Sequence, residues 1–299
     1  MKISISFDSH IFKNKSKTQI IHSIKDIKNY YKSILINFVK ETNFNPEYID
    51  AVIFEKNMTN YGYVEAITND KNTNFQIHLD DMILLDLTLN PNSTETFMAK
   101  SIFQHEIFHC IEIKYLWDNN ILPSPNPLDD NFTITTTYNF LYDEAVKIWS
   151  EIYAVYNNRK INVMHDMPDV RIDIQNIQLW LSKIKENALK SVDNKIELPS
   201  ELLQSLHSFW YHLVSMIALY IESGDQILID DYKNSDDIIC SYFDILYNYI
   251  KININAYPAW LSEENYLKFG KILMSIISYY DLDFATEDLS DIFILKLRK

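Results

Sequence analysis

The chain has 299 residues, of which 47% are hydrophobic and 14% are aromatic. That composition supports a large buried core, in one domain or two closely joined ones, and excludes a disordered chain. Asp and Glu number 41 against 27 Lys and Arg, so the net charge is −14. Such an acidic chain is a poor ligand for nucleic-acid phosphates, and we expect no nucleic-acid partner.

Cysteine use and hydropathy predict a cytoplasmic protein. Cys110 and Cys240 are far apart and neither belongs to a Cys-x-x-Cys pair, which fits a reducing compartment. Residues 1–10 lack a basic stretch followed by an apolar segment, so no secretory signal is expected. No run of 18 or more apolar residues occurs, so no membrane span is expected either.

The first 90 residues predict a mixed α/β region. Residues of helical spacing predict a helix over Lys17–Thr42. Alternating or apolar runs predict strands at Lys2–Phe7, Tyr48–Glu55, Gly62–Thr68 and Phe75–Leu79, with a further strand at Met82–Leu89.

From there on the pattern is mostly helical, and the scarcity of turn residues, with 3 Gly and 8 Pro, favours long helices. Asn92 and Glu95 predict the capped start of a helix that runs over Ser93–Leu116. A Pro-rich loop over 121–131, either a stiff connector or a lid, leads to a second helix over Leu141–Tyr156. Further helices are expected over 172–190, 200–223, 235–251 and 263–281.

The first of these helices contains His105-Glu106-Ile107-Phe108-His109, the His-Glu-x-x-His pattern. Residues four apart on a helix lie on one face, so both imidazoles can bind one zinc ion. Glu106 follows the first ligand and can act as a general base toward water. The flanking residues are mostly apolar, which indicates a buried helix. Two histidines that only form hydrogen bonds there are the competing interpretation.

A catalytic zinc site needs a third protein ligand and an open fourth position. Glu144 and Glu151 on the second helix are candidates. Being seven residues apart, they lie on one side of the helix but about 10 Å apart along it, so only one can bind the same ion. Glu112, three residues after His109, can orient an imidazole or pair with a nearby Lys.

The segment Ser93–Tyr156 resembles the gluzincins, which are zincin peptidases with His-Glu-x-x-His and a downstream Glu ligand. Trp149-Ser150-Glu151-Ile152-Tyr153-Ala154 is similar to the W-x-E-x-x-A form of that ligand, and Asp143-Glu144-Ala145 is similar to an E-A form. The resemblance therefore implies Zn²⁺ held by His105, His109 and Glu151, with Glu144 as the alternative third ligand.

The resemblance also implies how the site works. Glu106 would take a proton from a zinc-activated water that attacks a peptide carbonyl, and would return the proton to the leaving amine. A Tyr or His on a downstream helix would stabilise the oxyanion, for which His207, His212 and Tyr211 are candidates. An edge strand beside the metal helix would bind the substrate peptide, and Phe75–Leu79 is the expected counterpart.

Together these features predict an α+β fold. Residues 1–160 would form a zincin-like catalytic domain with a mixed sheet and active-site helices, and 161–299 an all-α subdomain that walls the cleft. The predicted function is a zinc metallopeptidase that hydrolyses an intracellular protein or peptide. The alternatives are a catalytically silent zincin-fold binding protein that acts through its helical C-terminal half, and a zinc hydrolase of a non-peptide amide.

Overall fold

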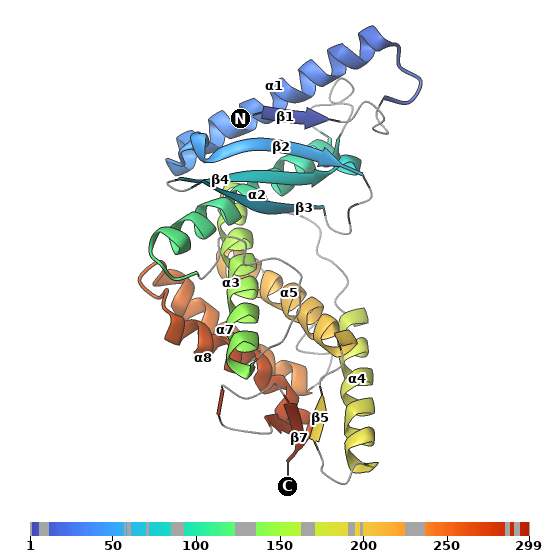
Figure 1. Cartoon of the computed structure of the whole chain (residues 1–299), viewed down its shortest axis with the longest axis vertical. Coiled ribbons are helices and arrows are strands. Elements are labelled where there is room, and N and C mark those ends of the chain that lie inside the picture. The colour runs from blue at the N-terminus through green and yellow to red at the C-terminus, as the bar shows by residue number, and fades with distance from the viewer. Residues whose placement is uncertain are drawn as a thin grey trace. The chain divides into compact units, whose positions relative to one another are not determined.

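The computed structural model describes residues 2–5, 12–56, 58, 61–69, 72–84, 93–122, 136–162, 171–190, 195–197, 200–224, 237–284, 288–289 and 294–298. It contains both helices and strands (Figure 1). The helices are α1 (Lys17–Thr42), α2 (Thr94–Asp118), α3 (Thr137–Ile161), α4 (Arg171–Lys190), α5 (Ser200–Ser223), α7 (Asp237–Asn255) and α8 (Glu263–Met274). The strands are β1 (Lys2–Ile5), β2 (Ile49–Glu55), β3 (Gly62–Asn69), β4 (Asn72–Asp80), β5 (Lys195–Glu197), β6 (Leu282–Phe284) and β7 (Ile294–Leu297).

The chain divides into two compact units. The first comprises Met1–Asn126 with Lys160–Met164, and the second comprises Pro127–Arg159 with His165–Lys299. This division differs from the expected boundary at residue 160, because nearly all of α3 belongs to the second unit.

The first unit is built on a four-stranded mixed sheet of order β1-β2-β4-β3. β2 runs parallel to β1 and to β4, whereas β3 pairs antiparallel with β4. The expectation that Phe75–Leu79 forms an edge strand is therefore wrong: this segment lies within β4, between β2 and β3. Among the described strands, β1 and β3 are the two edges of this sheet, because β4 pairs with β2 on one side and with β3 on the other.

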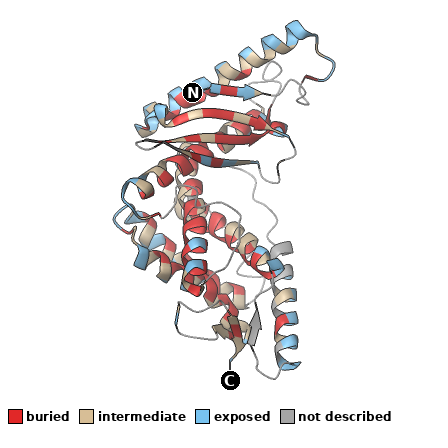
Figure 2. Cartoon of the chain, in the orientation of Figure 1, coloured by how far each residue is buried: buried red, intermediate tan, exposed pale blue. Residues whose placement is uncertain are grey.

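The two helices α1 and α2 lie on the same face of this sheet. Tyr31 of α1 contacts both Phe54 of β2 and Phe103 of α2, with ring centroids 5.2 and 5.1 Å apart. The predicted bounds of α1 are confirmed, and Ser16 caps it with a reciprocal bond to Gln19. Burial along α1 is confined to one stripe, as Figure 2 shows.

Two local expectations between β4 and α2 need correction. Asp81–Ile83 forms a 3₁₀ turn and not the start of a strand, since the Asp80 carboxylate caps it by accepting from the Met82 N–H at 2.7 Å. Residues 85–92, including Asn92, lie outside the described residues, as do 123–131 of the Pro-rich loop. The N-cap of α2 is Ser93, whose hydroxyl accepts from the Thr96 N–H at 3.2 Å.

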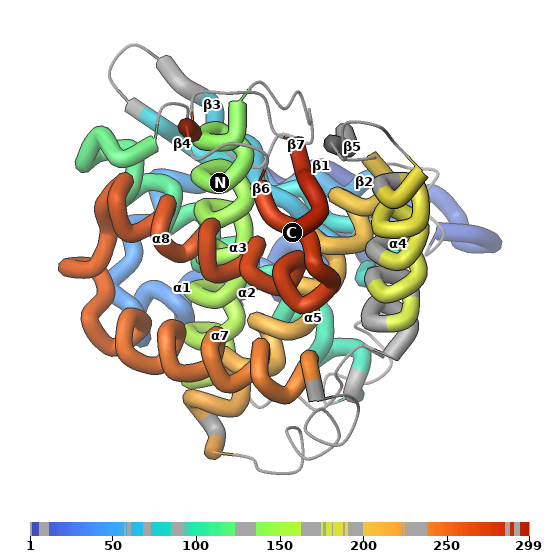
Figure 3. The backbone as a smooth tube through the Cα atoms, turned by 90° about the horizontal axis from the view of Figure 1, so that it is seen from below, coloured from blue at the N-terminus to red at the C-terminus, as the bar shows by residue number. Residues whose placement is uncertain are grey.

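Helices α3, α5, α7 and α8 supply most of the second unit's core, and Figure 3 shows α7 running beside α8. Large aromatic side chains join them. Trp149 of α3 stacks on Trp260 at 3.9 Å, and the Tyr242 hydroxyl of α7 donates to the Leu273 carbonyl of α8 at 2.5 Å. The side chains that are almost fully buried here are Trp149, Trp210, Tyr242, Tyr266, Phe209, Phe243 and Phe269.

The second unit is not all-α as expected. It contains a three-stranded sheet of order β5-β7-β6, in which both pairings are antiparallel. The helix expected over 263–281 ends at Met274 and continues as a 3₁₀ helix over Ser275–Tyr280 before β6. Two short strands near the C-terminus thus replace an uninterrupted helical ending.

Cys110 and Cys240 are both free thiols, so no disulfide joins them. Among the helices described, none combines the length and the apolar character needed to cross a membrane.

Gly270 of α8 permits a close approach to α3 in the second unit. A Cβ built there would lie 2.2 Å from the carbonyl oxygen of Leu141 in α3, which is backbone and cannot turn aside. We predict that Gly270→Ala lowers the free energy of unfolding by about 2–3 kcal/mol, measured by urea denaturation.

Gly224→Asn is the control for this substitution. Gly224 has a φ of +67° and no atom within 4 Å of its Cβ position, and Asn tolerates that conformation. Its expected effect is below about 0.5 kcal/mol. Equal effects of the two substitutions would contradict the close approach of α8 to α3.

Candidate metal centre

The helix that carries the His-Glu-x-x-His pattern is buried along most of its surface. The side chains of Phe103, Ile107 and Cys110 are fully inaccessible to solvent, which confirms the expectation drawn from the apolar flanks. His109 is 3% exposed, and His105 is half-buried. Both imidazoles are therefore shielded from bulk water to a degree that strengthens any interaction they make.

The two imidazoles turn toward one another. Their Nε2 atoms lie 3.0 Å apart, and the rings meet at 83° with centroids 4.7 Å apart. This distance is that of a hydrogen bond, in which the tautomers decide which ring nitrogen donates. Two nitrogens at zinc-ligand distance in a tetrahedral site are separated by roughly 3.3 Å, so little movement would convert this pair into two ligands of one ion.

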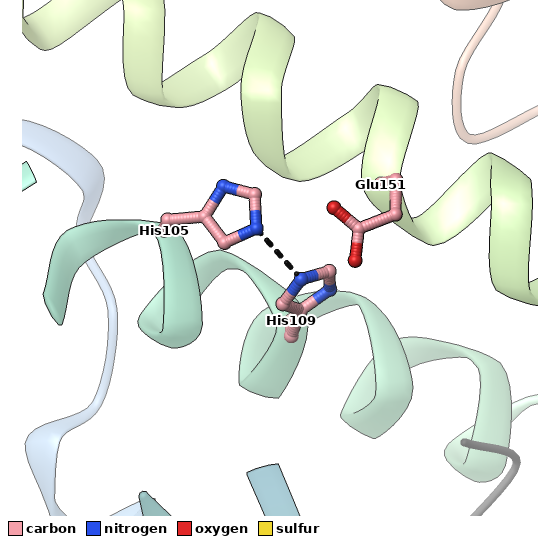
Figure 4. Close-up of side chains that lie close together, drawn as sticks. All are labelled: His105, His109 and Glu151. Atoms are coloured by element: carbon pink, nitrogen blue, oxygen red, sulfur yellow. Dashed lines mark hydrogen bonds between the residues drawn. The ribbon is translucent and has the colours of Figure 1, made fainter. Parts of the chain in front are cut away.

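Glu151 supplies a third candidate ligand atom. One ligand atom each of His105, His109 and Glu151 lies within 4.8 Å of the other two. Figure 4 shows these three side chains close together. In the described part of the chain this is the one group of three His, Cys, Asp or Glu side chains close enough to hold a metal ion.

Glu144, the alternative third ligand, is outside this group and has a different partner. Its side chain is 3% exposed, and its Oε2 accepts a hydrogen bond from Nδ1 of His207 in α5 at 2.9 Å. The two glutamates of α3 thus serve different histidines, as their separation of about 10 Å along the helix requires.

His207 acquires an altered proton affinity from this contact. Burial alone would lower its pKa, but the hydrogen bond to Glu144 and the charge of Glu144 outweigh burial and raise it. Lys147 lowers the pKa of His207 and Glu151 raises it, each by a smaller amount. The net result is a raised pKa, which favours an imidazolium paired with a buried carboxylate.

Glu106, the expected general base, is 6% exposed and packs against β3. Its carboxylate lies beside the backbone of Gly62, the first residue of that strand. Burial raises the pKa of the neighbouring Cys110 thiol, and the charge of Glu106 raises it further. Cys110 is therefore a neutral thiol near pH 7 and does not compete with the histidines for metal.

The other candidates do not join the group of His105, His109 and Glu151. Tyr211 and His212 are neighbours on α5, with rings edge to face at 5.4 Å. Glu112 is completely buried one turn after His109. His78 lies on β4, where its Nδ1 bonds the Glu55 carboxylate at 2.6 Å.

Three features of the site escaped prediction from the sequence. They are the His207–Glu144 pair, the packing of Glu106 on Gly62, and a buried bond in which the Asn162 amide donates to the Gln104 side-chain oxygen at 2.6 Å. Each joins residues at least 44 positions apart, so no local periodicity signals it. A lone Gly at the start of a predicted strand was the one visible hint of a close approach.

The chain matches no protein-family model, and comparisons with curated proteins and with solved structures found no match either. The resemblance to gluzincins therefore rests on the residues of the sequence motif alone.

The His207–Glu144 pair should make stability depend on pH. A raised folded-state pKa stabilises the protein fully below the unfolded value, about 6.5, and this contribution is lost as the pH rises through the folded value. We predict that Glu144→Gln lowers the free energy of unfolding by about 1–2 kcal/mol at pH ~6 and by less at pH ~9.

The measurement is urea denaturation of metal-free protein at the two pH values. Lys147 and Glu151 also act on His207, so the same substitution is repeated in a His207→Gln background, where its pH dependence should vanish. A difference that stays constant with pH, or persists without His207, would show that this pair is not the cause.

Proposed function

We propose that the chain is a zinc-dependent peptidase in which His105, His109 and Glu151 hold the metal and Glu106 is the general base. The observation that carries this proposal is the pair of imidazole Nε2 atoms 3.0 Å apart on one buried helix, with Glu106 between the two histidines in sequence. Burial of two histidines and a glutamate on one helix lowers the stability of the fold unless these groups have partners or a function.

The donor atoms fit zinc. Two imidazole nitrogens and one carboxylate oxygen form the ligand set of many zinc peptidases, and they leave a fourth position open. The three ligand atoms are already within 4.8 Å of one another. Zinc held there would supply a Lewis acid, which polarises a carbonyl oxygen and makes water acidic enough to lose a proton near pH 7.

The chain's own residues would handle the protons. Glu106, nearly buried, would accept a proton from the attacking water and pass it to the leaving amine. His207 would donate to the oxyanion that develops on the substrate, because Glu144 favours its protonated form. The charge of Glu151 adds to the raised pKa of His207, so His207 lies within electrostatic reach of the proposed ligand in the same unit.

A peptide is the substrate class that the first unit suits best. β3 lies at one edge of the described sheet, and a substrate peptide would bind there by strand addition. β3 is also the strand whose first residue contacts Glu106. A peptide bound along β3 by main-chain hydrogen bonds would therefore run past the general base. This replaces the assignment of that role to Phe75–Leu79.

Metal content tests the proposed ligands. We expect about one zinc per chain in the wild type by elemental mass spectrometry, little in His109→Ala and Glu151→Ala, and an undiminished content in Glu144→Ala, because Glu144 bonds His207 instead. A wild type that takes up no zinc on incubation would end the peptidase proposal. Loss of zinc from Glu144→Ala but not from Glu151→Ala would reverse the choice of ligand.

Glu106→Gln separates catalysis from metal binding. The amide keeps the shape of the side chain but cannot accept the proton, so we expect full zinc content and a cleavage rate lower by about 10²–10⁴-fold. Cleavage is measured on a mixed peptide library by mass spectrometry. Glu95→Gln, an exposed change on the first turn of the same helix, should keep the wild-type rate. Equal rates in wild type and Glu106→Gln would remove Glu106 from the mechanism.

A further inference from the structure

The three glycines of this chain have different reasons to be glycine. Gly224 has a φ of +67°, which side chains disfavour, and nothing lies near its Cβ position. Gly270 is held close to the backbone of Leu141. Gly62 lies in a β-strand without a positive φ, so its backbone conformation is open to any residue, and the strand would be more stable with a side chain there.

What distinguishes Gly62 is the neighbour that its missing side chain would meet. A Cβ at this position would lie 2.8 Å from Oε1 of Glu106 and 3.1 Å from both Cδ and Cγ. Leu79, which pairs with Gly62 across the ladder, points to the same side and is completely buried. The Glu106 side chain therefore occupies the space that any larger residue at position 62 would fill.

We infer that Gly62 is a positioning residue, which sets the place of the Glu106 carboxylate by leaving room for it against β3. The inference rests on the proposed function, since it concerns the base of that reaction. A glutamate has three side-chain torsions and loses much of its freedom when one side of its carboxylate is bounded by strand backbone. A base confined in this way is already near one geometry before substrate arrives.

The contact also predicts which part of the protein would yield to an added methyl group. At Gly270 the opposing atom is a main-chain carbonyl, so the helices themselves must separate. At Gly62 the nearest atom is the far end of a flexible side chain, which can turn to another rotamer. Gly62→Ala should therefore displace the base and leave the fold and the metal ligands in place.

The first test needs no catalysis. It compares the thermal unfolding temperatures of four metal-free proteins: wild type, Gly62→Ala, Glu106→Ala and the double variant. Without Glu106, the Gly62→Ala change should raise the unfolding temperature by about 1–2 °C, because Ala restricts the unfolded chain. With Glu106 present, the gain should disappear or become a loss. An equal gain in both backgrounds would overturn the inference.

The second test measures how Gly62→Ala affects catalysis by the proposed general base, Glu106. Zinc-loaded Gly62→Ala should keep the wild-type metal content and a similar KM on a cleaved library peptide, while its kcat falls about 10–100-fold. If Gly62→Ala only disturbed the structure, it would instead lower the metal content or raise KM. If the wild type cleaves peptides and Gly62→Ala has the same kcat, the positioning role is refuted although the peptidase proposal stands.

Failure of the proposed function would give a different set of results from failure of the positioning role. A wild type that binds no zinc and cleaves no peptide would refute the reaction, and with it a role for Gly62 in that reaction. The thermal comparison would still report whether Gly62 and Glu106 are coupled, since it is made on metal-free protein.

Discussion

Burial of α2 against the sheet is the constraint on which the rest of the site depends. The helix presents apolar side chains on several sides, and between them Gln104, Glu106, His109 and Glu112 are all at most 6% exposed. Polar groups removed from water destabilise the fold unless each has a partner. Gln104 accepts a hydrogen bond from Asn162, Glu106 packs on Gly62, and His109 meets His105. The hydrogen bonds of Gln104 and His109 help the helix to be buried, and the bond between the two imidazoles sets how they face one another.

On helix α3, the spacing of two glutamates determines which partner each of them can have. Glu144 and Glu151 lie two turns apart on one side of the helix, so they cannot share a partner. Glu144 is deeply buried and is charge-paired with His207, while Glu151 is half-buried and lies among the ligand atoms. The structure thus offers a physical reason for preferring Glu151 where the sequence offered two similar candidates.

Local signals predicted the fold where the contacts are local and failed where they are not. Helical spacing gave both ends of α1, and the His-Glu-x-x-His pattern placed two imidazoles together, because four-residue spacing on a helix determines that contact. The order of the sheet depends on the parallel pairing of β2 with β4, which no hairpin signal marks, so the edge strand was misassigned. Strands β5, β6 and β7 have three or four residues each, too few for an alternation to stand out from a helical pattern.

The glycines show why the sequence reveals a close approach less readily than a structure does. Gly62 and Gly270 both occupy regular elements in which glycine is the less stable choice, and neither needs an unusual backbone conformation. Seen in the sequence alone, the two are equivalent. The difference lies in how easily the neighbouring atoms can move. The main-chain carbonyl of Leu141 in α3 resists displacement, whereas the carboxylate of Glu106 can turn away. An added methyl group at Gly270 would therefore disturb the packing of the helices, whereas at Gly62 it would displace a single side chain, the proposed general base.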